Sequence, residues 1–258
     1  MSDWALRRRS RRLAFDAALI LGTLAAWKAL VVVAELPTLI LPAPEVVWLS
    51  LWTAVWDGTL WPHLLTTLTE VAGGFALGAV VGVSLGSVVG VFPTLGRLIG
   101  PYVVASQAVP KLALAPLLAV WLGFGLTPKI VIAALISFFP LFENTVLGLR
   151  SAEPAQLELF RVLRASRWQA FTRLQLPGAI PSIATGARVA LVLALVGAVV
   201  AEFVGANRGL GALLISAQGV LDTPLMFAVF VVLTVLGIAL YGLAAAGERA
   251  VVRWRDGG

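Results

Sequence analysis

The sequence predicts an all-α integral membrane protein with about six transmembrane helices. Of its 258 residues, 60% are hydrophobic and only 12% are charged, whereas a soluble domain carries about 25% charged residues. A soluble fold of this size cannot bury so much apolar surface, but a bilayer accepts it in helices of about 20 apolar residues. The cations behind the net charge of +6 lie between the apolar runs, which indicates the inner face of a membrane and not a nucleic-acid partner.

The residues that the chain lacks exclude several kinds of chemistry. It has no cysteine and a single histidine, His63, so disulfides and thiolate metal sites are excluded and a histidine-based catalytic triad is implausible. No G-x-x-x-x-G-K-[ST] phosphate loop occurs, so the chain does not hydrolyse ATP by that route. We therefore expect no metal or cofactor on this chain, and a separate ATPase if ATP drives its function.

Six segments are apolar and long enough to span a bilayer. Pro110, Pro116 and Pro140 interrupt some of them. Such interruptions survive in a bilayer only where neighbouring protein or water satisfies the freed carbonyl groups, which favours a packed bundle around a cavity. The six predicted spans are residues 13–34, 64–92, 98–122, 129–149, 178–204 and 224–247.

The distribution of cations predicts the orientation of these spans. Fourteen of the 19 Lys and Arg residues fall on the side of the N-terminus, and two, Lys129 and Arg208, fall on the other side. The remaining three, Lys28, Lys111 and Arg188, lie within spans. Because cytoplasmic loops carry an excess of Lys and Arg, we expect the tails at residues 1–12 and 249–258 to be cytoplasmic.

The segment after the first span, residues 36–62, is rich in proline and tryptophan. Trp48, Trp52 and Trp56 recur every four residues and share one face of a helix. Since tryptophan prefers the membrane–water boundary, we interpret the segment as a short helix lying on the outer surface. A plain external loop is the alternative. Residues 13–63 are thus predicted to hold the first span and an external interfacial segment.

A stripe of glycines runs along the second span. Their spacing of four places them on one helix face, where another helix can approach closely. We interpret the stripe as a packing feature and not as a functional site. The glycines are Gly74, Gly78, Gly82, Gly86 and Gly90.

The loop between the fourth and fifth spans, residues 150–177, has the pattern of two short helices. Pro154 suits a first helical turn, and an amphipathic pattern follows it. Ser166 and Gln169 form a predicted capping box that begins a second helix, and Pro177 is expected to end it. With a tight turn at Ala165–Ser166, the segment is suited to docking into a soluble partner; an ordinary solvated loop is the alternative.

Within this loop the sequence resembles the "EAA" loop of permeases of binding-protein-dependent ABC importers. Glu158 takes the position of the motif's Glu, and Leu174-Gln175-Leu176-Pro177 takes its I-x-L-P end. Other stretches resemble the nitrate, sulfonate, taurine and pyrimidine-precursor branch of the family, and together the resemblance covers residues 64–254. These stretches are residues 138–151, 165–182, 197–211 and 221–227.

The resemblance implies a type I ABC importer permease bundle whose core is residues 64–248. It implies that the loop forms a coupling helix seated on a cytoplasmic ATPase, which binds ATP and Mg. It also implies a periplasmic substrate-binding protein, a homodimer of the permease in the lipid of the inner membrane, and alternating access for a small solute. The residues assigned to coupling are Glu158, Arg161, Arg164, Ala165, Ser166, Arg167, Trp168 and Pro177.

The loop departs from the family pattern at three positions. Leu159 and Phe160 replace the two alanines, and Arg164 replaces the glycine. Glycine permits a positive φ there, and arginine makes it costly. We expect either a turn shifted toward Ala165–Ser166 or a helix that continues through the position.

Polar residues inside spans are candidates for the solute pathway, because buried charge is costly in a membrane. Gln107 and Lys111, four residues apart in the third span, are the first choices. Snorkelling at span ends is the alternative, and Arg188 can pair with Glu143 across helices. The predicted pathway residues are Gln107, Lys111, Glu143, Asn144, Arg188 and Glu202, and Glu70 is a further charge within a span.

Two other functions compete with an ABC permease. An ATPase-independent secondary transporter or channel is disfavoured, since no internal inverted repeat is apparent and six spans are few for one. A membrane enzyme is disfavoured because the chain lacks a recognisable nucleophile–base pairing.

Overall fold

The computed structural model describes residues 3–252, and no strand occurs in that range. The chain divides into two compact units. The first comprises Met1–Leu60 and Leu213–Val232, and the second comprises Trp61–Ala212 and Leu233–Gly258. The all-α class predicted from composition is confirmed.

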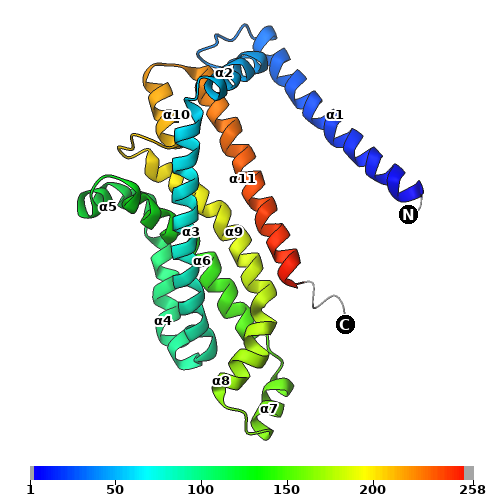
Figure 1. The fold of residues 1–258 in the computed structure, drawn as a ribbon, viewed down its shortest axis with the longest axis vertical. Coiled ribbons are helices and arrows are strands. Elements are labelled where there is room, and N and C mark those ends of the chain that lie inside the picture. The colour runs from blue at the N-terminus through cyan, green and yellow to red at the C-terminus, as the bar shows by residue number, and fades with distance from the viewer. Residues whose placement is uncertain (1–2, 253–258) are drawn as a thin grey trace. The chain divides into compact units, whose positions relative to one another are not determined.

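The first unit contains α1 (Asp3–Val33) and α2 (Pro44–Trp56) (Figure 1). The predicted first span lies within α1, whose apolar part in the range described with side chains is Ala18–Val33. An ion pair of 3.0 Å joins Lys28 to Glu45. The predicted tryptophan segment is helical: it is α2, and Trp48 and Trp56 are 64% and 72% exposed.

Most of the remaining helices belong to the second unit, while α10 and α11 cross between the units. Single turns of 3₁₀-helix, η1 (Ser106–Ala108) and η2 (Lys111–Leu114), interrupt the middle of the chain. The α-helices are α3 (Leu60–Val91), α4 (Pro93–Ala105), α5 (Ala115–Leu122), α6 (Leu126–Arg150), α7 (Pro154–Val162), α8 (Arg167–Ala170), α9 (Leu176–Glu202), α10 (Leu210–Gly219) and α11 (Thr223–Val252).

Among the described residues, four continuous helical stretches are apolar and long enough to cross a bilayer, and a bent pair of helices makes a fifth crossing where its halves form one broken span and not a re-entrant loop. The predicted third span is not straight: its two halves meet at 79°. Val109 is extended, with φ −70° and ψ 125°, because the ring of Pro110 disfavours a helical residue before it. Pro140, in contrast, stays inside the continuous α6. The four stretches are Leu60–Val91, Leu126–Arg150, Arg167–Glu202 and Thr223–Val251.

Helix α6 packs between α3 and α9 through small residues. A Cβ added to Gly82 would lie 2.8 Å from the carbonyl oxygen of Phe138, and one added to Gly86 would lie 2.8 Å from that of Phe142. Gly74, Gly78 and Gly90 likewise face Ala133, Ser137 and Leu149 of α6. On the opposite side, a Cβ on Gly186 of α9 would lie 2.8 Å from the oxygen of Pro140. The glycine stripe is therefore placed against α6, where backbones approach closely.

Candidate functional site

The segment that joins α6 to α9 forms the two short helices α7 and α8. As predicted, Pro154 lies in the first turn of α7. The predicted capping box of α8 is confirmed: the Gln169 N–H donates to Ser166 Oγ at 3.2 Å, and the Ser166 N–H donates to Gln169 Oε1 at 2.7 Å. Both helices lie beyond the ends of α6 and α9 in the second unit (Figure 1).

The turn between α7 and α8 is made by Arg164, which adopts a positive φ of 52°. The N–H of Ala165 donates to the Phe160 carbonyl and that of Arg164 donates to the Arg161 carbonyl, both at 2.9 Å. This pair of bonds is a Schellman motif, in which the residue with positive φ is usually glycine. Neither expected alternative, a shifted turn or a continuing helix, occurs. The two hydrogen bonds satisfy the last carbonyls of α7 and offset the strain at Arg164.

The expectation that Pro177 ends the second helix is wrong. Helix α8 continues through a π-helical turn, η3 (Phe171–Gln175), directly into α9, so that Arg167–Glu202 is one helix of 36 residues. Pro177 has no N–H to donate and its ring crowds the preceding turn. The wider π turn, in which the Leu176 N–H reaches back to the Phe171 carbonyl, accommodates the ring without breaking the helix.

The surface of this segment is unusually apolar for a connection. Trp168 of α8 is 70% exposed, Val162 of α7 is 72% exposed, and Leu159 and Leu163 at the same end of α7 are also exposed. Glu158 and Arg161 form an exposed ion pair of 3.2 Å on the same helix, a kind of pair that adds little stability. The exposed apolar set, rather than the ion pair, makes this segment suitable for contact with another protein.

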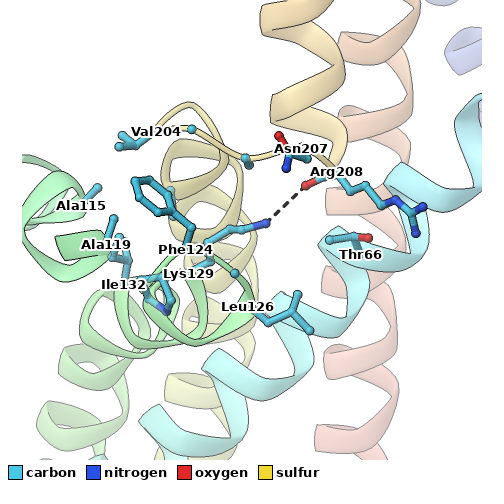
Figure 2. A pocket seen from close by; sticks show the side chains of 15 residues that line it. Thr66, Ala115, Ala119, Phe124, Leu126, Lys129, Ile132, Val204, Asn207 and Arg208 are labelled. Atoms are coloured by element: carbon cyan, nitrogen blue, oxygen red, sulfur yellow. Dashed lines mark hydrogen bonds between the residues drawn. The ribbon is translucent and has the colours of Figure 1, made fainter. Parts of the chain in front are cut away.

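A pocket of about 400 Å³ lies in the second unit where α6 begins and α9 ends. Figure 2 shows Phe124, Lys129 and Ile132 on one side of it and the loop after α9, residues 203–209, on the other. Gly125 and Gly205, with φ of 146° and 68°, form the bends on either side. The walls thus come from α3, α5, α6, α9 and the 203–209 loop.

Lys129 is a buried member of this pocket wall. It lies in the first turn of α6 and is 8% exposed. Its ammonium group is 2.5 Å from Glu70 Oε1 of α3 and donates to the carbonyl oxygen of Arg208 at 3.3 Å (Figure 2, dashed line). The sequence places Lys129 among the cations on the outer side, and it is not one of the predicted pathway residues. Glu70 is the residue in the sequence that could have indicated Lys129, because a carboxylate within a span requires a partner of opposite charge.

Glu202, at the end of α9, is the anchor of the 203–209 loop. It is 1% exposed. Its Oε1 accepts from the Thr67 hydroxyl at 2.6 Å, and its Oε2 accepts from the Gly211 N–H at 2.5 Å. Thr67 in turn accepts from the Leu210 N–H at 2.8 Å. The side chains of α3 and α9 therefore fix the loop's return into α10.

The other predicted pathway residues do not gather at this pocket. Lys111 donates to Gln107, and Asn144 donates to the Pro140 carbonyl at 2.8 Å. Glu143 is exposed. None of the six predicted residues is among the described residues that line the pocket, which include Lys129, Arg208 and Asn207.

Arg188 has a different partner from the one expected. Its guanidinium lies 3.2 Å from Glu248 of α11 and 5.2 Å from the centre of the Tyr241 ring. Pairing with Glu143 is therefore wrong. Thr185 also donates to Glu248, at 3.0 Å, so this polar cluster joins α9 to α11. Over the described part of the chain, no group of three or more His, Cys, Asp or Glu side chains is placed to hold a metal ion.

Apolar helices long enough to span a bilayer, exposed apolar residues on α7 and α8, and a pocket where α6 begins are typical of a membrane transport protein. The chain belongs to the family of binding-protein-dependent transport system inner membrane components, whose model matches residues 74–253. The expected ABC permease is thereby confirmed over the secondary transporter or channel. The chain is a non-enzymatic transport subunit, and the ATPase is a separate partner.

Similar proteins agree with this assignment. The riboflavin transport system permease protein RibX of Chloroflexus aurantiacus is 41% identical over 228 residues, which cover 88% of this chain and 85% of that protein. The formylaminopyrimidine transport permease protein ThiX of Halalkalibacterium halodurans is 36% identical over 199 residues, covering 77% and 80%. The fold also matches a solved chain of the MetNI methionine ABC transporter, with a TM-score of 0.68, 21% identity, and 77% and 98% coverage.

Proposed function

We propose that this chain moves a small solute across the inner membrane by alternating access, and that α7 and α8 dock into a cytoplasmic ATPase that binds ATP and Mg. The observation that carries the proposal is the exposed apolar set at Leu159, Val162, Leu163 and Trp168. Exposure of these apolar side chains to water is unfavourable, and burying them in a groove on a partner lowers the free energy.

The helix that contains α8 and α9 supplies the route from the ATPase to the pocket. It runs without a break from Arg167 to Glu202, and Glu202 is bonded to Thr67 and to the Gly211 backbone. A displacement of α8 is thus carried through one rigid element to the residue that anchors the 203–209 loop. Glu158, Arg161, Arg164, Ala165, Ser166, Arg167, Trp168 and Pro177 act in this coupling.

The proposed orientation follows from the cations. It places both termini and the α7–α8 segment in the cytoplasm, and it places Lys129, Arg208 and the pocket toward the outer side. A substrate-binding protein on that side delivers the solute. Gln107, Lys111, Glu143, Asn144 and Arg188 remain candidates for the path beyond the pocket.

A nitrogen heterocycle is the solute class that similarity favours. RibX, named for riboflavin, shares 41% identity, whereas relatives named for aliphatic sulfonates and taurine share 31–35%. The pocket presents the aromatic ring of Phe124 and the amide of Asn207, which suit stacking and hydrogen bonding to such a ring.

A second copy of the chain and membrane lipid are the remaining proposed partners. Val120, Trp121 and Phe124, on and beside α5, are 76%, 69% and 78% exposed next to the open pocket. A twofold-related copy that covers this side closes the pathway between two permeases. The exposed tryptophans of α2 are suited to the outer lipid boundary.

Purification in mild detergent with the ATPase subunit tests the docking proposal. Trp168→Ala is expected to reduce the recovered ATPase at least tenfold, because it removes an exposed aromatic anchor. Trp56→Ala is the matched control, since Trp56 is 72% and Trp168 is 70% exposed, and it is expected to leave recovery unchanged. Equal recovery with both variants, or uptake that persists without any ATPase, contradicts the proposal.

A further inference from the structure

The segment that joins α6 to α9 carries more positive charge than its own carboxylates neutralise. Residues 151–177 contain four arginines and two glutamates. Glu158 pairs with Arg161 at 3.2 Å, whereas neither Arg164 nor Arg167 takes part in an ion pair with any described residue. Both of these arginines are exposed. The turn between α7 and α8 therefore presents two guanidinium groups that no carboxylate of the described chain neutralises.

Arg164 occupies the one position of this turn where its own backbone disfavours it. Its φ of 52° and the bonds of Ala165 and Arg164 to the carbonyls of α7 form the Schellman motif. Glycine adopts this conformation without steric cost. Because the guanidinium has no ion pair within the described chain, nothing there offsets the strain through the side chain. A residue strained in this way points to a function of its side chain.

The reach of the adjoining helix favours a protein partner over lipid headgroups. The helix from Arg167 to Glu202 has 36 residues and is about 50 Å long, whereas the hydrocarbon core of a bilayer is about 30 Å thick. Arg164 lies three residues before this helix begins. Figure 1 shows α7 and α8 beyond the ends of α6 and α9. In the proposed orientation, the turn therefore projects into the cytoplasm.

Resting on the docking proposed above, we propose that Arg164 pairs with a carboxylate of the ATPase at the edge of the groove that takes Trp168. Leu163, directly before Arg164, is 67% exposed and Trp168 is 70% exposed, so the guanidinium belongs to the border of the apolar set. The planar guanidinium binds a carboxylate through two parallel hydrogen bonds. A charge in this place discriminates between partners. Arg164 thus selects an ATPase whose groove is bordered by Asp or Glu.

The affinity of the detergent-solubilised permease for its ATPase tests this pairing. At about 0.1 M NaCl, Arg164→Ala is expected to lower the affinity about tenfold, and the loss is expected to shrink at about 1 M NaCl, where charges are screened. Arg164→Gly is expected to lower it equally while the unfolding midpoint rises, which separates the contact from folding. Arg97→Ala is the control and is expected to leave the affinity unchanged, since Arg97 of α4 is also exposed and has no ion pair with a described residue.

Arg164→Lys allows the partner carboxylate to be located. It retains the charge and supplies an amine in a segment, residues 150–177, that contains no lysine. A carbodiimide is expected to join this amine to an Asp or Glu of the ATPase, identified by mass spectrometry of the joined peptides. The wild-type segment is expected to give no such product.

The outcomes separate this pairing from the docking itself. If Trp168→Ala lowers the affinity while Arg164→Ala and Arg164→Gly do not, the pairing is overturned and the docking remains. If none of the three lowers it, both are overturned. An effect of Arg164→Ala that appears only in nanodiscs with anionic lipid, and not in detergent, assigns the guanidinium to lipid headgroups and also overturns the pairing.

Discussion

The ammonium group of Lys129 lies 2.5 Å from Oε1 of Glu70, and this contact joins the first turn of α6 to the first half of α3 inside the membrane-spanning bundle. Glu70 is fully buried and Lys129 is 8% exposed. A buried ion pair of this kind adds modest net stability, but removing either partner is strongly destabilising because the other is left as a buried, unpaired charge.

Removing the ammonium group of Lys129 alone is expected to destabilise the protein strongly. Lys129→Met keeps the length of the side chain but leaves the buried Glu70 without its counter-ion. We expect a loss of about 3–5 kcal/mol in the free energy of unfolding, measured by thermal unfolding in detergent. Glu70→Gln is the comparison and is expected to cost less, because the glutamine oxygen and the Arg208 carbonyl still accept hydrogen bonds from Lys129. A Lys129→Met protein as stable as the wild type contradicts the role of the pair.

The close approach of α3 to α6 predicts a steric penalty. A Cβ on Gly82 would lie 2.8 Å from the Phe138 carbonyl oxygen, whereas one on Gly100 of α4 meets nothing within 4 Å. We expect Gly82→Ala to lower stability by about 1–3 kcal/mol, as overpacking does. Gly100→Ala is expected to be neutral or stabilising, because alanine favours a helix. Equal unfolding midpoints for the two variants would show that the helices separate easily.

The strained turn between α7 and α8 offers a stabilising change. Arg164 holds a φ of 52° in its Schellman motif, a conformation that costs a non-glycine residue about 1–2 kcal/mol. Arg164→Gly is expected to recover part of that strain and raise the unfolding midpoint. Arg164→Ala removes the guanidinium but keeps the strain, so it separates the two effects. If the alanine variant gains as much as the glycine variant, backbone strain is not the cause.

The absence of cysteine from the chain makes its orientation easy to test. Asn207→Cys places one thiol in the loop at the pocket, and Gln156→Cys places one on the exposed side of α7. With a membrane-impermeant maleimide on intact spheroplasts, we expect labelling at 207 and not at 156. Labelling at 156 is expected after the membrane is permeabilised. The reverse pattern contradicts the proposed topology.

Local signals in the sequence predicted several features well. The capping box at Ser166 and Gln169 and the close approach at Gly82 each depend on residues a few positions apart on one helix. The apolar content predicted the all-α membrane class, because hydropathy is additive along the chain. Pro110 likewise identified the break in the third span, since a proline acts on its own neighbours.

Features that depend on partners distant in the sequence were not predicted. Glu202 was predicted as a pathway residue, but its hydrogen bonds to Thr67 and Gly211 were not predicted, because tertiary packing brings these partners to it. The Arg188–Glu248 pair crosses from α9 to α11 for the same reason. Pro177 was misjudged because a π turn, which leaves no composition signal, lets the helix pass through it.

The length of the continuous helix from Arg167 to Glu202 determines how far one end moves when the other end tilts. At 1.5 Å per residue its 36 residues extend about 50 Å. A tilt of about 5° at one end of a rod of this length shifts the other end by about 5 Å, which is close to one helical turn. Under the proposed coupling, a slight tilt of α8 would therefore displace the Glu202 end of this helix by about the size of a side chain.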